Sequence, residues 1–170
     1  MLAWLFAASL SLPSQLWAQA TPSAADMVEQ LKVQPAAAPR TRSLRNLTVE
    51  AADATPAARP SLSLLIQFDF NSAKVKPESQ QALSNLAQAL QSKELADSKF
   101  AVEGHTDAKG RADYNLKLSQ QRADAVRAFL ASNGVLDARL QAVGKGSSDL
   151  ANTTDPLAAE NRRVRIVNLN

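Results

Sequence analysis

The stretch VEGHTDAKGRADYNLKLSQQRADAVRAFL, residues 102 to 130, contains a strand pattern, a polar turn and a long helical pattern in direct succession. KFAVEG (99 to 104) is typical of a strand, and residues from about 112 to 133 have the spacing of an amphipathic helix that stops at Gly134. The helix is expected to bury Leu118, Ala125, Val126, Phe129 and Leu130. The turn between strand and helix holds the only histidine of the chain, His105. Its polar groups therefore lie at the end of a strand.

Upstream of this segment, the sequence predicts a further strand and a further helix. LSLLIQFDF (62 to 70) alternates along its length and places on one face Leu64, Ile66, Phe68 and Phe70. Pro77 then opens the helical pattern PESQQALSNLAQALQS, with Glu78 near its positive end. A strand followed by an amphipathic helix predicts a helix that packs on a sheet.

Downstream, LQAVG (140 to 144) predicts a third strand and a helical turn is expected near Ala158. RRVRIVNL (162 to 169) predicts a last strand, with Val164 and Ile166 on its core face. The order βαβαβ(α)β predicts an α+β fold, a two-layer sandwich whose helices pack on one mixed sheet.

The first two strands are expected to run in the same direction, because a strand–helix–strand crossover returns the chain that way. Residues 69 to 71 and 105 to 107 then leave the same carboxyl edge of the sheet. Open α/β sheets bind their ligands at this edge.

The composition limits the class of protein. The chain has 170 residues, of which 45% are hydrophobic, so one folded domain with appendages is expected. With 19 basic and 16 acidic residues, the net charge of +3 is too balanced for a nucleic-acid-binding surface. The absence of cysteine excludes disulfides, thiolate metal sites and a cysteine nucleophile.

Changes in composition divide the chain into three segments. Residues 1 to 20 carry no charge and end in Ala18-Gln19-Ala20, which is typical of a cleaved export signal; the alternative is an uncleaved anchor. Residues 21 to 60 are rich in Ala, Pro, Thr and Ser and predict a flexible linker. Residues 61 to 170 form the folded domain. No segment after the signal predicts a transmembrane helix.

The polar cluster allows several interpretations. A metal site is poorly supported, because one histidine beside Glu103 and Asp107 is fewer than the two His or Cys ligands that zinc sites typically have. A serine hydrolase is also not indicated, because the sequence has no G-x-S-x-G nucleophile elbow. His105 is expected to fix a turn by bonding backbone, and Asp107 to cap the turn around Gly110. Asp107 and Arg122 can also pair with each other, or they can bind the ammonium and the carboxylate of a zwitterion.

Three segments together resemble a known family. FDFNSAKV, EGHTDAKGRADYNLKLSQQRADAV and AAENRRVRI are similar to the signature segments of the OmpA-like C-terminal domain, in the same order over residues 64 to 169. The resemblance implies non-covalent binding of peptidoglycan through the diaminopimelate of its stem peptide, without catalysis or cofactor. It implies an exported protein of a Gram-negative-type envelope, periplasmic or associated with the outer membrane, that links an envelope component to the wall.

The resemblance also implies the site residues. Asp107 matches the aspartate that takes the ammonium, and Arg122 the arginine that takes the carboxylate. Further positions of the cleft match Asp69, Asn71, Thr106, Asn115 and Leu118. Arg162 or Arg163 matches a second basic contact, and Asn161 is expected to pin a loop.

Two positions depart from the family pattern. GKGSSD (144 to 149) replaces a frequent G-x-G-E, and Ala158 replaces a frequent arginine.

A rival function lies in the linker. APRTRSLRNLTVE (38 to 50) carries Arg40, Arg42 and Arg45 and is a candidate for recruiting an outer-membrane or other envelope protein. Under this hypothesis the domain is a protein–protein interaction module, and wall binding is secondary.

Overall fold

The structure is a computed structural model that describes residues 21–33, 59–69 and 71–170. In chain order its elements are α1 (Ala24–Leu31), β1 (Ser61–Leu64), α2 (Pro77–Leu90), β2 (Phe100–His105), α3 (Ala112–Ser132), the 3-10 turn η1 (Asp137–Arg139), β3 (Leu140–Gly146), the 3-10 turn η2 (Ala159–Asn161) and β4 (Val164–Asn168). The predicted export signal (1 to 20), the basic segment (38 to 50) and Phe70 lie outside the described residues.

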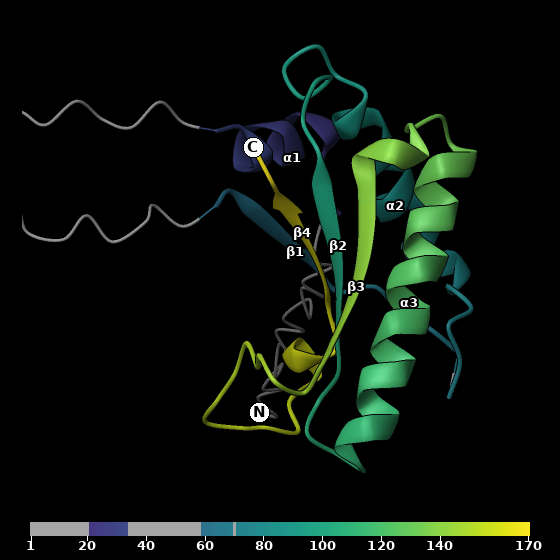
Figure 1. Cartoon of the computed structure of the whole chain (residues 1–170), viewed down its shortest axis with the longest axis vertical. Coiled ribbons are helices and arrows are strands. Elements are labelled where there is room, and N and C mark those ends of the chain that lie inside the picture. Colours follow the sequence, from purple (N-terminus) through teal and green to yellow (C-terminus); the bar gives the residue numbers. More distant parts are fainter. Residues whose placement is uncertain (1–20, 34–58, 70) are drawn as a thin grey trace, which may run out of the picture.

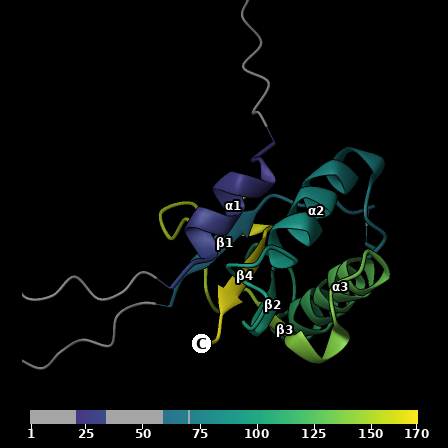
Figure 2. The ribbon, with the colours of Figure 1, turned by 90° about the horizontal axis from the view of Figure 1, so that it is seen from above.

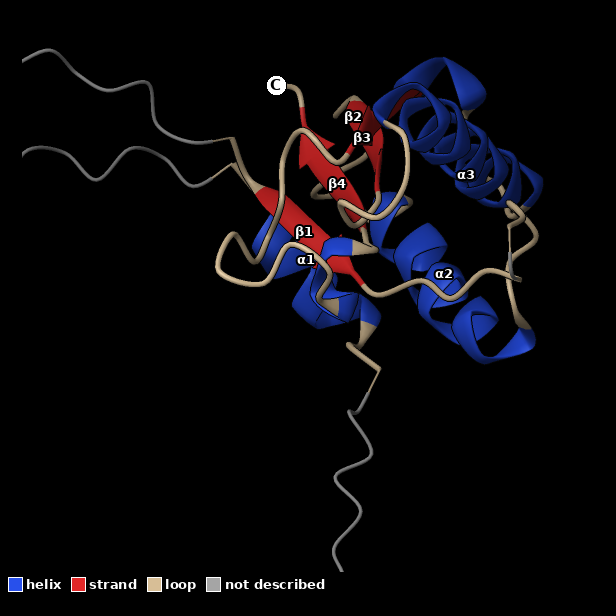
Figure 3. Ribbon diagram, turned by 90° about the horizontal axis from the view of Figure 1, so that it is seen from below, coloured by secondary structure: helices blue, strands red, loops and turns tan. Residues whose placement is uncertain are grey.

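The four strands form one mixed sheet in the order β1-β4-β2-β3 (Figure 1). β4 is antiparallel to both β1 and β2, whereas β2 and β3 are parallel. β1 and β2 therefore run in the same direction without being neighbours. The helices lie on one side of the sheet, as Figures 2 and 3 show from above and below. The predicted two-layer α+β fold is confirmed.

One hydrophobic core lies between the two layers. Its largest fully buried side chains come from both layers and include Phe100, Val102, Ile166, Leu83, Leu86, Leu90, Val126 and Leu130. Val164 and Ile166 face this core, as the alternation of the last strand predicts. The core holds α2 and α3 on the sheet and so fixes where the loops at its edge lie.

The first strand is shorter than the pattern predicts. β1 ends at Leu64, although Ile66 beyond it is still buried in the core. The backbone N–H of Ile66 bonds the Leu64 carbonyl, and that of Gln67 bonds the Ser79 hydroxyl on α2. Because the Gln67 amide is bonded to a helix instead of a strand, the ladder stops and the chain turns toward the sheet edge.

α3 packs on the sheet through small residues, a difference from the expected apolar stripe. Its buried residues are Asn115, Ser119, Ala123, Val126 and Leu130, whereas Leu118, Ala125 and Phe129 are half-buried. A Cβ built on Gly104 would lie 2.2 Å from the Ser119 carbonyl oxygen, and one on Gly144 would lie 2.6 Å from the Gln120 nitrogen. The helix backbone thus rests almost directly on the backbone of β2 and β3.

α1 lies inside the segment 21 to 60 that was predicted to be a flexible linker, and that prediction is wrong for residues 24 to 31. Ser23 and Asp26 form a capping box at its start. Met27 and Leu31 are 0% exposed and belong to the core. The short apolar face is stabilised by burial against α2 and β1, which offsets the weak helix propensity of so short a segment.

No helix within residues 21–33, 59–69 and 71–170 is long and apolar enough to cross a membrane.

Candidate functional site

The loops that follow β1 and β2 meet at one edge of the sheet, because the two strands run in the same direction. A cleft of about 630 Å³ lies there, between these loops, α3 and the segment before β4. Eight of the nine predicted site residues line it: Asp69, Asn71, Thr106, Asp107, Asn115, Leu118, Arg122 and Arg162. Arg163 does not line it.

Asp107 is a shielded carboxylate on the wall of the cleft, with its side chain 16% exposed. Its Oδ1 accepts the backbone N–H of Lys109 at 3.2 Å, as the turn interpretation predicts. Its Oδ2 accepts Nη1 of Arg162 at 2.8 Å. A carboxylate offers about four lone-pair sites, so a further donor can approach from the cleft.

Arg122 projects from α3 across the cleft. Its Nε donates to the Ser72 carbonyl at 3.2 Å, and its guanidinium lies 4.8 Å from the centre of the Phe68 ring. Burial is the main cause that lowers the pKa of Arg122, and the neighbouring Arg162 charge lowers it further, against Tyr114 and Asp107. Among the described residues Arg122 makes no ion pair, so the structure does not contain the alternative in which Asp107 and Arg122 pair with each other.

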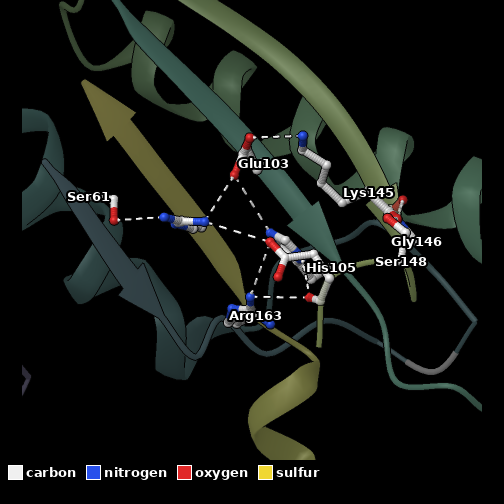
Figure 4. A network of polar contacts seen from close by, with 10 residues as sticks. Ser61, Glu103, His105, Lys145, Gly146, Ser148 and Arg163 are labelled. Atoms are coloured by element: carbon white, nitrogen blue, oxygen red, sulfur yellow. Dashed lines mark hydrogen bonds and ion pairs between the residues drawn. The ribbon is translucent and has the colours of Figure 1, made fainter. Parts of the chain in front are cut away.

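The open choice between two arginines has a clear structural answer. Arg162 lines the cleft. Arg163 points instead to the face of the sheet that the helices do not cover, and it is 7% exposed. There its Nη2 donates to the Asp149 carbonyl at 3.2 Å (Figure 4). The two residues differ because consecutive side chains of an extended chain point to opposite faces.

Buried polar side chains hold the loops that form the cleft. Asn115 donates through Nδ2 to the carbonyls of Asp107 and Lys109, at 3.3 and 3.0 Å. Asn161 is 0% exposed and bonds the backbone of Asn152 on both sides, so it pins that loop as predicted. Thr106 is 3% exposed, and its Oγ1 has no partner among the described residues. Asn115 and Asn161 therefore hold two of the loops beside the cleft in place.

His105 projects from the face of the sheet that the helices do not cover (Figure 4), and it is not among the residues that line the cleft. Its ring Nδ1 is 3.1 Å from the Asp149 carbonyl oxygen, which fits the expectation that His105 bonds backbone. Glu103 is 3.9 Å from His105 Nε2 and pairs with Lys145 at 3.3 Å. In the part of the chain that the structure describes, no group of three acidic, histidine or cysteine side chains could hold a metal.

A pH dependence of stability follows from His105. The ring is 1% exposed, and burial is the main cause that lowers its pKa below the ordinary 6.5, with the Arg163 charge adding to it. The unfolded chain then binds a proton at a higher pH than the folded chain does. The free energy of unfolding is expected to be unaffected by His105 above about pH 6.5 and to fall as the pH drops below it.

Urea unfolding at pH 7.5, 6 and 5 measures this effect, because His105 is the only histidine in the sequence. His105→Gln should show a flatter dependence than the wild type. Equal slopes for the two proteins would contradict the assignment.

Four lining residues were missed as site residues: Phe68, Lys109, Tyr114 and Leu157. Tyr114 and Leu157 are 46% and 58% exposed. In the sequence, a large aromatic or aliphatic residue among polar neighbours is a signal that could have indicated a rim. Phe68 was predicted only as core, yet it also supports Arg122.

The chain is similar in sequence to several known proteins. A family model described as "OmpA family" matches residues 67–164. Outer membrane porin F of Pseudomonas aeruginosa is 41% identical over 123 residues, which cover 70% of this chain and 35% of that protein. The probable lipoprotein YiaD of Escherichia coli is 39% identical over 103 residues, covering 59% of this chain and 46% of that one. The chain thus spans less than half of the length of either relative.

Among solved structures, the peptidoglycan-associated lipoprotein from Burkholderia pseudomallei is similar at 36% identity. The match has a TM-score of 0.53 and covers 66% of this chain and 91% of that one.

Proposed function

The chain belongs to the OmpA family, and from this we propose that it binds peptidoglycan non-covalently, through the diaminopimelate of the stem peptide. The similarity to a lipoprotein that is named as peptidoglycan-associated supports peptidoglycan as the ligand. The observation that carries the proposal is the pair of opposite charges, Asp107 and Arg122, on the walls of one cleft without an ion pair between them.

The chemistry of the pair fits the free end of diaminopimelate, which carries one ammonium and one carboxylate. The ammonium donates to the Asp107 carboxylate, whose remaining lone pairs face the cleft. The carboxylate takes the Nη1 and Nη2 groups of Arg122, which have no partner among the described residues. Since Ser72 and Phe68 already hold the guanidinium, little side-chain entropy is lost on binding.

The proposed role is mechanical attachment, in which the domain ties an envelope component to the cell wall at the periplasmic or outer-membrane side. The function is binding without catalysis. The described residues that line the cleft include no histidine, cysteine or serine that would form a nucleophile–base pair.

Pull-down with isolated sacculi tests the proposal. The full chain should be retained by diaminopimelate-containing murein and not by lysine-type murein, because lysine lacks the carboxylate that Arg122 would bind. Equal retention on both, or on neither, would refute the diaminopimelate specificity.

The rival interaction function rests on the basic segment, residues 38 to 50, which lies outside the described residues. Replacing this segment by a Gly/Ser segment of equal length leaves α1 in place and separates the two functions. Retention on murein should persist in this variant. If retention is lost, the basic segment is the main binding element.

A further inference from the structure

A second cavity shares residues with the cleft, and the proposed function assigns no ligand group to it. It has a volume of about 340 Å³ and lies between the chain that leaves β1 and the turn η2. Arg122, Arg162 and Phe68 line both cavities. The two arginines are thus shared by the walls of both cavities.

The two cavities differ in charge. The cleft contains the carboxylates Asp69 and Asp107 together with its basic residues. Among the described residues that line the second cavity none is acidic, and the charged groups are the two guanidiniums. The rest of its wall is mainly apolar, from Leu65, Ile66, Phe68 and Ala159. The cleft suits a zwitterion, whereas the second cavity suits an anion on a small apolar group.

The arginines have donors left for a second anion. A guanidinium carries five N–H groups. Arg122 uses its Nε on Ser72, and Arg162 uses its Nη1 on Asp107, with a long 3.5 Å contact to the Leu157 carbonyl. The other N–H groups of both have no hydrogen-bond partner among the described residues. Two neighbouring positive charges repel each other, and an anion between them removes that repulsion.

We propose that the second cavity is a subsite for the carboxylate-bearing end of the same stem peptide, a small apolar residue such as the terminal D-alanine that follows diaminopimelate. This inference rests on the proposed function. It assigns Arg162 a role beyond holding Asp107, since the same guanidinium would bind the terminal carboxylate. It also predicts a preference for stems that end in a free acid.

Calorimetry with two synthetic peptides tests the subsite. One is the tetrapeptide L-Ala-γ-D-Glu-diaminopimelate-D-Ala, and the other is the same peptide with a C-terminal carboxamide. The wild-type chain should bind the acid about ten-fold more tightly, because a charge-assisted contact with guanidinium is lost in the amide. Equal affinities for the two peptides would overturn the subsite.

A variant separates the subsite from the clamp. Ala159→Trp puts a large side chain into the second cavity and should reduce binding of the acid by about ten-fold, and binding of the amide by less, because the amide has no carboxylate contact there to lose. Ala128→Trp, at an exposed position of α3 outside both cavities, is the matched control and should bind like the wild type. Thermal melting of both variants shows that the fold is kept.

The failure of the subsite and the failure of the proposed function differ. If Asp107→Ala weakens both peptides but the acid and amide bind alike, the clamp stands and the subsite is wrong. If neither peptide binds the wild type, both proposals are wrong. A similar loss for acid and amide in Ala159→Trp would also reject the subsite.

Discussion

Asp107→Ala is expected to weaken binding of a diaminopimelate-containing stem peptide by about ten- to a hundred-fold. A hydrogen bond to a charged group contributes roughly 1.5–3 kcal/mol, and each 1.4 kcal/mol is about a factor of ten in affinity. The loss has two sources in the structure. The ligand ammonium loses its acceptor, and Arg162 loses the partner at 2.8 Å that holds it in the cleft.

Arg122→Ala is expected to give a loss of similar size, since it removes the guanidinium that binds the ligand carboxylate. The double variant should lose less than the product of the two single losses, because both residues bind the same diaminopimelate residue and each positions it for the other. Calorimetry with a purified stem peptide measures all three variants. The wild type with a lysine-type peptide should approach the affinity of Arg122→Ala with the diaminopimelate peptide.

The chain offers a matched pair of controls. Arg127 on α3 and Asp137 in η1 form an ion pair that lines neither cavity. Arg127→Ala and Asp137→Ala should leave the affinity unchanged. If the Asp107 and Arg122 variants lost melting temperature while their folded fraction bound either murein type equally, the clamp would be rejected.

Leu31→Ala is expected to lower the free energy of unfolding by about 2–5 kcal/mol, the range for deleting a buried aliphatic side chain from a core. Leu31 is 0% exposed, and its carbonyl accepts Nδ2 of Asn168 at 2.9 Å. Met27→Ala should act alike, since Met27 is equally buried. Urea unfolding of the single variants measures the effect.

Val33→Ala is the matched control, because Val33 is an aliphatic residue two positions away that is 52% exposed. Its change in unfolding free energy should stay within about 0.5 kcal/mol. Leu31→Ala with wild-type stability would mean that α1 is not part of the folded unit and that the linker prediction holds for residues 24 to 31.

Sequence patterns were sufficient for the sheet and the two long helices. The apolar segments 99 to 104 and 162 to 169 located β2 and β4 to within a residue or two, and Pro77 marked the first residue of α2. The common direction of β1 and β2 follows from the crossover rule. The same rule predicts from the sequence that the loops after these strands lie at one edge of the sheet. These are local or topological properties, and they do not depend on long-range packing.

The missed helix α1 had a local signal that was too short to stand out. Ser23 with Asp26 three residues later is a capping box, and Met27, Val28 and Leu31 follow at helical spacing. Eight residues surrounded by an Ala/Pro-rich sequence are marginal as an isolated helix. Only burial against α2 and β1 stabilises them, and that contact is long-range.

The partners of the charged residues could not be predicted from local sequence patterns. Asp107 pairs with Arg162, 55 positions along the chain, and Arg122 bonds the Ser72 carbonyl, 50 positions away. Which of Arg162 and Arg163 faces the cleft depends on where β4 begins, and a shift of one residue exchanges the two faces. The residue types of the site were therefore predictable, and their pairing was not.

The direct backbone contact of α3 with the sheet has a consequence for divergence and design. At Gly104 and Gly144, the spacing between helix and sheet is set by main-chain atoms, because no side chain fits between them. Arg122 is carried by that helix, and Asp107 lies just beyond the end of β2. Exchanges among the core leucines and valines can change the volume between α2 and the sheet while the interval between these two charges stays fixed. Core sequence and ligand recognition are thus free to drift separately, and a redesigned core could inherit the recognition geometry intact.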